Sequence, residues 1–482
     1  MGRWAEDTAA ACRALAPSVA LPTADALDAI AARATATPAV VVTGPVSSGK
    51  STLVNALVGR RVAPTGAGEC TRLTARYTRG PVDRLDVVLT DGTRRPLPLV
   101  DGGRVPASVG DRLGVAPTDV DHLLVTLTSD ALDGLTVVDT PGAGSARRPA
   151  ATVDGPADAE AALVVLPSSA RPDEVDRLAG AARRGPPGVV AVLGRADTVG
   201  SAADADVVAA TLSRRLGPRL GPVTPVVGLL AETATTGALR TPDLQALAAL
   251  ASADRETLAT ALADPELFLQ TALPVDVPAR ARLLELLDRR GITLAVTLLR
   301  ERPGAGVGDV CAALLAASGL DEVVARLRAE VRARADLLAA VAAERRVEAL
   351  APAELAALRA DRPAGRAVPF SGRDAELRAD LVEDLRARPF HLDLDLAGAT
   401  ARHRSGALDL PADLGEELEL LADPGAALPA RLGLGEGELA GHAARRAAAW
   451  RGYAAWGTPP ARADVAEAVH RGWARIWGEL TR

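Results

Sequence analysis

The stretch GPVSSGKSTLVNALVG, residues 44–59, decides the fold of this 482-residue chain. It fits the pattern G-x-x-x-x-G-K-[S/T], follows the apolar run AVVVT (39–43), and opens a segment whose apolar residues have helical spacing. The backbone N–H groups of such a loop, and of the helix that follows it, face the phosphates of a bound nucleotide. Residues 44–59 therefore predict a P-loop between a strand and a helix.

Lys50 is the only lysine in the chain, and Asn55 is the only asparagine. An ammonium on a thin stem can reach between the β- and γ-phosphates inside a closed loop, where the broad fork of an arginine would not fit. Ser51 is expected to place its hydroxyl on Mg²⁺. The other loop residues expected to contact the nucleotide are Gly44, Ser47, Ser48, Gly49 and Thr52.

A second motif, LTVVDTPGAG (135–144), follows about 90 residues later. It puts Asp139 at the carboxyl end of an apolar strand, where open α/β sheets hold their ligands. We expect Asp139 to position Mg²⁺ through water and the Gly142 N–H to reach a γ-phosphate oxygen. The alternative interpretation is a simple β-turn at residues 140–142.

The overall composition indicates a globular protein, with 48% hydrophobic residues and a net charge of −6. This charge argues against nucleic acid as a partner. The widely separated Cys12, Cys70 and Cys311 indicate free thiols in a reducing compartment, hence the cytoplasm. No signal-peptide pattern or apolar run of membrane-spanning length is visible, so membrane contact is expected to be peripheral.

Hydrophobic patterning predicts an α/β domain, with a mostly parallel sheet and helices on both faces, followed by an α-helical neck and trunk. The expected domains are residues 1–36 (helices joining the neck), 37–240 (nucleotide-binding domain) and 241–482 (helical neck and trunk). Residues 91–118 are expected to be a surface excursion. Residues 320–350 predict one uninterrupted helix of about 45 Å that projects from its domain. The predicted strands are AVVVTG, LDVVLT, HLLVTLT, LTVVDT, AALVVL, VVAVLG and VTPVVG.

Together with PTGAGECTR (64–72), the two motifs resemble the dynamin superfamily of large GTPases, and longer stretches resemble the isoniazid-inducible (IniC-type) dynamin-like proteins of actinobacteria. The resemblance implies GTP and Mg²⁺ as cofactors, with Thr71 closing over Mg²⁺ and the γ-phosphate. It also implies that Ser47, Gly66 and Gly68 bind a monovalent cation, Na⁺ or K⁺. Lys50, Ser47 and Thr71 are then the catalytic residues, and Ser51, Thr71 and Asp139 are the metal-binding residues.

Two departures from the family pattern affect catalysis and base selection. Val46 stands where dynamins usually carry a polar residue, which predicts slow hydrolysis without self-association. The base-reading motif, which is usually [N/T]-K-x-D in this family, is GRAD (194–197) here, so position 194 lacks its usual polar side chain. Asp197 is expected to accept from guanine, and the stem of Arg195 to lie across the ring. Gly228 and Leu229 are expected to offer backbone contacts to the base. An ordinary turn at 194–197 and an ATPase are the alternatives.

Four of the five tryptophans lie in the last 33 residues, and the fifth is Trp4. We expect Trp4 to lie near Trp473 and Trp477 in a bundle built from both ends of the chain. Core packing is the preferred role for the C-terminal tryptophans, with membrane insertion as the alternative. The turn at 361–372 offers Phe370 either to an anionic bilayer or as a hydrophobic staple beside a capping box of Ser371 and Asp374.

The resemblance implies hydrolysis of GTP to GDP and phosphate, coupled to self-association and to peripheral membrane binding and remodelling at the inner face of the cell membrane. The expected partners are a second copy or a paralogous dynamin-like subunit, and an anionic membrane surface. The alternatives are a soluble regulatory GTP-binding switch and a partner subunit of low activity that acts through protein contacts.

Overall fold

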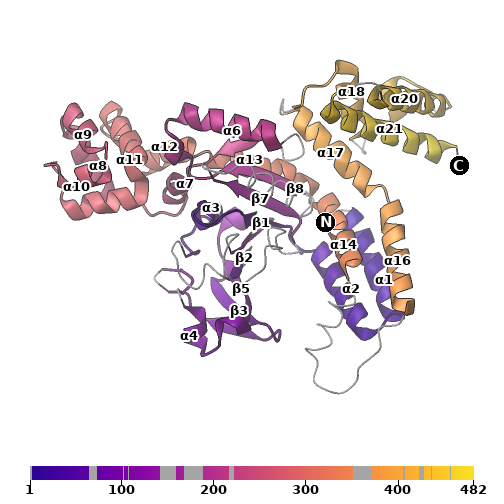
Figure 1. Ribbon diagram of the computed structural model, residues 1–482, viewed down its shortest axis with the longest axis horizontal. Coiled ribbons are helices and arrows are strands. Elements are labelled where there is room, and N and C mark those ends of the chain that lie inside the picture. The colour runs from indigo at the N-terminus through magenta and orange to yellow at the C-terminus, as the bar shows by residue number, and fades with distance from the viewer. Residues whose placement is uncertain are drawn as a thin grey trace. The chain divides into compact units, whose positions relative to one another are not determined.

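The computed structural model divides the chain into two compact units, a sheet unit that ends at Arg328 and a helical unit built from both ends of the chain (Figure 1). The sheet unit comprises residues 37–216 and 222–328, and the helical unit comprises residues 1–36 and 329–482. The structure describes residues 3–64, 73–100, 102–106, 108–141, 159–167, 188–216, 222–350, 372–404, 408–422, 428–435, 437–455 and 458–481.

The described residues of the sheet unit form one sheet of nine strands in the order β4-β3-β5-β2-β6-β1-β7-β8-β9. The predicted α/β class is confirmed, and all the predicted strands are present. Two further strands, β2 and β4, were not predicted. The strands are β1 (Ala39–Thr43), β2 (Thr74–Arg79), β3 (Arg84–Leu89), β4 (Arg94–Leu97), β5 (Val120–Leu127), β6 (Thr136–Asp139), β7 (Ala161–Leu166), β8 (Gly188–Leu193) and β9 (Val223–Pro225).

The centre of the sheet is parallel, and the part that holds β2 to β5 is mixed. β1 lies between β6 and β7 and runs parallel to both. Every residue of β1 and β7 is buried, as expected for strands covered on both faces. β2 pairs antiparallel with β6, and β3 pairs antiparallel with both β4 and β5. The expected surface excursion at 91–118 therefore contributes an edge strand, β4.

The helices of the sheet unit include a lobe formed by α8 to α11 at one end of that unit (Figure 1). One apolar core joins this lobe to the sheet, because Leu230 and Ala196 pack in the same cluster as Leu247 and Leu287. The compact unit therefore extends past the expected boundary at residue 240. The helices are α3 (Lys50–Val58), α4 (Val109–Leu113), α6 (Ala202–Leu216), α7 (Gly228–Thr235), α8 (Thr241–Ser252), α9 (Arg255–Ala261), α10 (Pro265–Gln270), α11 (Val277–Glu301), α12 (Val307–Ser318) and α13 (Leu320–Glu330).

The prediction of a single long helix over residues 320–350 is wrong, because the first helix, α13, ends at Glu330. A 3₁₀ turn (Arg332–Arg334) separates α13 from α14 (Ala335–Ala349). The break follows the change of compact unit at residues 328–329. α13 buries Val323 and Leu327, and its Arg326 donates to the carbonyl of Ala191 in the sheet. It therefore packs against the sheet unit and does not project from it.

In the helical unit, the N-terminal helices pack against helices from the second half of the chain. α1 and α2 contact α14, and α1 also contacts α16. Asp336 accepts hydrogen bonds from the backbone N–H groups of Trp4 and Ala5, and Asp374 accepts from that of Ala20. The helices are α1 (Arg3–Leu15), α2 (Leu21–Ala34), α14, α16 (Gly372–Ala387), α17 (Phe390–Arg404), α18 (Ala412–Leu421), α19 (Leu428–Leu432), α20 (Leu439–Ala455) and α21 (Pro460–Leu480).

The tryptophans of this unit lie in separate cores. Trp4 meets Phe390 edge-on at 6.1 Å between ring centroids, in the core formed by α1, α2, α14 and α16. Trp473 is fully buried in a second core with Trp450, so its expected core role is confirmed. Trp4 therefore lies outside the core that holds Trp473, because the α1–α2 pair buries its apolar stripe against α14. The expected proximity of Trp4 to Trp473 and Trp477 stays a prediction.

The carboxylate of Glu417 organises the second core. It accepts from the indole Nε1–H groups of Trp450 (2.5 Å) and Trp473 (2.6 Å) and pairs with Arg446. Trp477, by contrast, is 47% exposed. Trp456, Phe370 and Ser371 lie outside the described residues. Among the described residues, no helix is both long enough and apolar enough to span a bilayer.

Candidate nucleotide site

The loop between β1 and α3 has the backbone shape that its glycines allow. Gly44 and Gly49 have φ angles of 153° and 90°, and Ser47 adopts a left-handed φ of 64°. A Cβ atom added to Gly44 would lie 2.3 Å from the carbonyl oxygen of Val165, so a side chain at this position requires the backbone to shift. The loop thus lies directly against β7 and ends at the N-terminus of α3, as predicted.

Lys50 starts α3 and folds back over the loop. Its side chain is buried, and Nζ donates to the carbonyl oxygen of Pro45 at 2.6 Å. Burial lowers the pKa of Lys50, and the nearby carboxylate of Asp139 opposes this shift. A compact cation at the helix N-terminus, surrounded by main-chain groups, suits an anionic ligand.

Asp139 and Ser51 come together because their strands are neighbours. The parallel register of β1 and β6 aligns Asp139 with Val42, two residues before the loop. The Ser51 hydroxyl donates to Oδ2 of Asp139 at 3.2 Å, and the Thr140 hydroxyl donates to the Val42 carbonyl oxygen at 2.9 Å. The predicted proximity of Asp139 to the start of α3 is therefore found in the structure.

The second carboxylate oxygen of Asp139 supports a metal site. Oδ1 is buried and has no hydrogen-bond partner in the described part of the chain, and burial raises the pKa of Asp139 to about 6. A buried, unpartnered carboxylate oxygen beside a serine hydroxyl provides hard oxygen donors, which suit Mg²⁺. Ser51 and Asp139 thus fit the predicted ion. Thr71, Gly66, Gly68 and Gly142 lie outside the described residues.

The predicted base loop begins where β8 ends. A Cβ atom at Gly194 would lie 2.3 Å from the carbonyl oxygen of Ser48 and 2.6 Å from Cγ1 of Val165. Gly194, which stands where the family usually has a polar residue, therefore occupies a position with no room for a side chain. Arg195 has a left-handed φ of 52°, and its Cγ lies 3.4 Å from the position of a Cβ on Gly49.

Hydrogen bonds and packing connect the base loop to α7. The Ala196 N–H donates to the Val226 carbonyl oxygen at 3.1 Å, two residues before Gly228 begins α7. A Cβ on Gly228 would lie 3.6 Å from Cγ2 of Thr52. The predicted residues Arg195, Gly228 and Thr52 are therefore gathered beside the P-loop. Asp197 is half-buried at the end of the same loop, and Leu229 follows Gly228 in α7.

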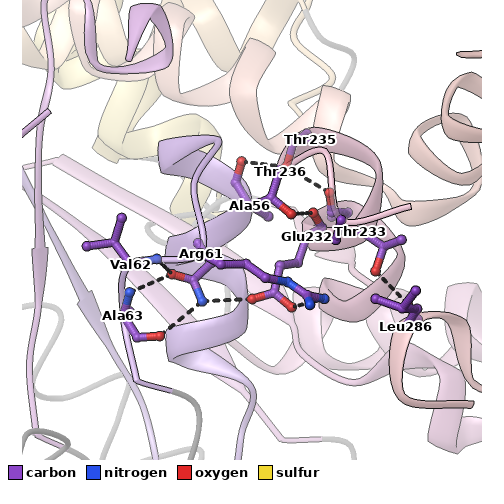
Figure 2. Close-up of polar contacts among 12 residues, drawn as sticks. Ala56, Arg61, Val62, Ala63, Glu232, Thr233, Thr235, Thr236 and Leu286 are labelled. Atoms are coloured by element: carbon purple, nitrogen blue, oxygen red, sulfur yellow. Dashed lines mark hydrogen bonds and ion pairs between the residues drawn. The ribbon is translucent and has the colours of Figure 1, made fainter. Parts of the chain in front are cut away.

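A buried polar network behind the loop was not predicted, although Asn55 stood out as the only asparagine. Asn55 bonds to Glu232 of α7 and to the backbone of Val62 and Ala63. Figure 2 shows Glu232 between Arg61 and the labelled threonines of α7. The rarity of asparagine in this chain was the only sequence signal for this network.

Residues 40–181 match the family model described as the dynamin family. This match confirms the predicted resemblance. The matched residues include the P-loop, Asp139 and the central strands β1, β6 and β7. The rest of the chain lies outside the matched residues.

Among curated proteins, the chain is similar to the isoniazid-induced protein IniC of Mycobacterium tuberculosis, in strains CDC 1551 / Oshkosh and ATCC 25618 / H37Rv. The identity is 33% over 305 residues, which covers 59% of this chain. The chain spans 60% of the length of these relatives.

Two solved structures of an oligomerised bacterial dynamin pair, described as a mechanism for long-range sensing and tethering of membranes, also align with the chain. They share 13% and 12% identity, with TM-scores of 0.37 and 0.36. The alignments cover 99% and 98% of this chain, and 86% and 85% of those chains.

Proposed function

We propose that this chain binds GTP with Mg²⁺ and hydrolyses it to GDP and phosphate. The observation that carries the proposal is the meeting of Lys50, Ser51 and Asp139 at the N-terminus of α3, within a dynamin-family domain. A buried cation, a hydroxyl and an unpartnered carboxylate oxygen within one site suit a magnesium-bound phosphate chain.

The position of each residue in the site suggests its role in binding the nucleotide. Lys50 and the N–H groups at the start of α3 would stabilise negative charge on the phosphates. Ser51 and Asp139 would hold Mg²⁺, which when bound neutralises charge that develops on the phosphate oxygens. Asp197 would accept from guanine, with the stem of Arg195 against the ring. Ser47, with its left-handed backbone, would contribute to a monovalent cation site.

The roles predicted for residues outside the described ranges belong to the same proposal. Thr71 would close over Mg²⁺ and the γ-phosphate, Gly142 would contact the γ-phosphate, and Gly66 and Gly68 would complete the monovalent cation site. In this scheme Lys50, Ser47 and Thr71 are the catalytic residues.

We also propose that nucleotide state controls self-association and peripheral membrane binding. The family match supports this extension. A second copy or a paralogous subunit would complete the site, and the surface contacted would be the inner face of an anionic membrane. The helical unit, built from both ends of the chain, would act as the neck and trunk.

A nucleotide panel tests the central claim. Wild-type protein is expected to bind GTP more tightly than ATP and to release phosphate only with Mg²⁺. Lys50→Ala is expected to lose binding or turnover. Arg302→Ala is the matched control, because it removes one positive charge from a side chain that is 60% exposed in the helical lobe. Normal turnover by Lys50→Ala would overturn the assignment.

The exposed side chain of Val46 favours a second candidate, a GTP-binding partner subunit with little turnover of its own. Val46 is 58% exposed on the loop and offers no polar group to orient a water molecule. Measuring turnover against protein concentration, with and without anionic liposomes, separates the candidates. A rate per molecule that rises with concentration supports the self-associating GTPase. Tight binding with no turnover under any condition supports the partner subunit, and indifference to liposomes supports a soluble switch.

A further inference from the structure

Two helices of the sheet unit begin at the proposed nucleotide site. α3 begins at Lys50, beside the predicted phosphate position, and α7 begins at Gly228, where base contacts are predicted. The two helices pack against each other from Thr52 and Gly228 onward. Their relative placement therefore sets the distance between phosphate contacts and base contacts.

A single side chain on α3 is bonded to its full capacity behind this site. The described residues show four hydrogen bonds for Asn55, which is 1% exposed. Its oxygen accepts from the N–H groups of Val62 (3.0 Å) and Ala63 (2.7 Å). Its nitrogen donates to the Ala63 carbonyl oxygen (3.1 Å) and to Oε1 of Glu232 (2.7 Å). Asn55 thus ties α3 to both α7 and residues 62–63.

Glu232 is the partner on α7, and it is 4% exposed. Its second oxygen, Oε2, accepts from Arg61 at 3.2 Å, so the buried charge is compensated (Figure 2). One turn further along, the Thr235 hydroxyl lies 3.2 Å from the Ala56 carbonyl oxygen of α3. A buried carboxylate with these partners resists displacement, because an unpaired buried charge is costly.

The contact lies at a similar depth below both helix starts. Asn55 is five residues after Lys50, or about 7.5 Å along α3, and Glu232 is four residues after Gly228, or about 6 Å along α7. A change at this contact is therefore expected to shift the start of α7 relative to the start of α3.

We propose that Asn55 and Glu232 are positioning residues that fix the base-contacting end of α7 relative to the phosphate-binding end of α3. They touch no nucleotide themselves. The inference rests on the proposed GTP site and deepens it, because it assigns to this pair the coupling of base binding to phosphate binding. Loss of the pair should weaken the contribution of guanine to the binding affinity and leave the affinity for the phosphates unchanged.

Two probes separate these contributions, a non-hydrolysable GTP analogue and inorganic tripolyphosphate, each titrated calorimetrically with Mg²⁺ into the full chain. For Asn55→Ala, we expect affinity for the GTP analogue to fall about tenfold, on the scale of one lost buried hydrogen bond to a charged group. Affinity for tripolyphosphate should change less than about twofold. A general loss of structure would lower both equally.

Exchanging the amide and the carboxylate between the two positions tests whether the lost affinity can be rescued. Asn55→Asp places a second carboxylate against Glu232 and should weaken GTP binding more than Asn55→Ala. Adding Glu232→Gln restores a donor opposite an acceptor and should recover part of the affinity. The matched control is Asp243→Ala, which removes another buried carboxylate of the same unit, 5% exposed and bonded to Arg282. It should lower the melting temperature without changing the ratio of the two affinities.

The outcomes are distinct. A selective loss for the GTP analogue, with rescue, supports the proposal. Equal losses for both probes, or no loss for either, overturn it. If Asn55→Ala does not fold, Glu232→Met, which keeps most of the side-chain volume but cannot accept from Asn55, gives the same reading of the ratio. Wild-type protein that binds neither probe would refute the proposed function itself.

Discussion

Replacing Asp139 by asparagine should stabilise the protein while abolishing the proposed magnesium-dependent GTP hydrolysis. The carboxyl group of Asp139 is held in a buried place, with Oδ1 unpartnered in the described part of the chain. Burial raises its pKa to about 6 from 3.8, against the opposing effects of the Lys50 ammonium and the Ser51 hydroxyl. An ionised carboxylate is thus maintained at the expense of stability, as expected where a site needs the charge for a ligand.

The magnitude follows from the two pKa values. Between about pH 4 and pH 6 the unfolded chain releases the proton of this carboxyl while the folded chain keeps it, so stability falls as the pH rises through this window. Above this window the loss reaches about 3 kcal/mol, at about 1.4 kcal/mol for each pH unit between the two pKa values. Asp139→Asn removes the loss, so it should melt roughly 3 to 5 °C higher at pH 7.5.

Scanning calorimetry of the full chain without nucleotide or metal, at pH 7.5 and pH 5, measures this difference. The advantage of Asp139→Asn should shrink to about half at pH 5. Asp243→Asn is the control with the opposite sign. Although burial acts to raise its pKa, hydrogen bonds from Arg282 and the Arg240 N–H lower it, so the charge stabilises the fold above the unfolded pKa. An Asp139→Asn variant no more stable than wild type at pH 7.5 would refute the reasoning.

Two further substitutions test other parts of the structure. Gly194→Asn, which installs a residue typical of the family motif, should collide with the Ser48 carbonyl oxygen and destabilise the protein by about 1 to 3 kcal/mol. Thermal melting and nucleotide titration measure this effect, and a variant with full stability and affinity would contradict the packing. Glu417→Ala leaves the indole N–H groups of Trp450 and Trp473 without their acceptor, so it should destabilise the helical unit by about 2 to 4 kcal/mol. Urea unfolding followed by tryptophan fluorescence measures this loss, and an unchanged midpoint would count against the network.

The central strands and the P-loop were predictable because their signals are local. β1, β7 and β8 are apolar runs bounded by turn residues, and the loop motif specifies its own backbone. β2 was missed because only two of its residues, Ala75 and Tyr77, are buried, so it forms no continuous apolar run like those of the central strands. Its antiparallel pairing with β6 depends on partners distant in sequence, which periodicity does not reveal.

The prediction of one long helix was wrong for a related reason. Residues 320–350 have uninterrupted helical spacing, but Val323 and Val341 belong to different compact units. The break at residues 332–334 arises where the chain leaves one core and enters the other. Tertiary packing, which no local pattern encodes, overrides the helical propensity there.

The candidate site shows the same limit. Motif spacing predicted that Asp139 would lie near Ser51, and the structure places the two side chains in contact. The functional roles of these residues stay predictions. At Gly194 the sequence showed a missing side chain, and only the structure shows the Ser48 carbonyl oxygen that leaves it no room. Asn55 drew attention by rarity alone, since its partner Glu232 is 177 residues away.

All five tryptophans belong to the helical unit, and the unit that carries the P-loop has none. Emission excited at the long-wavelength edge of the tryptophan band, where tyrosine does not absorb, therefore originates entirely outside the proposed catalytic domain. A nucleotide that affected only residues of its own unit would leave this emission unchanged. Any spectral response to GTP would be a direct optical record of a signal leaving one domain and arriving in the other, obtained without attaching a dye.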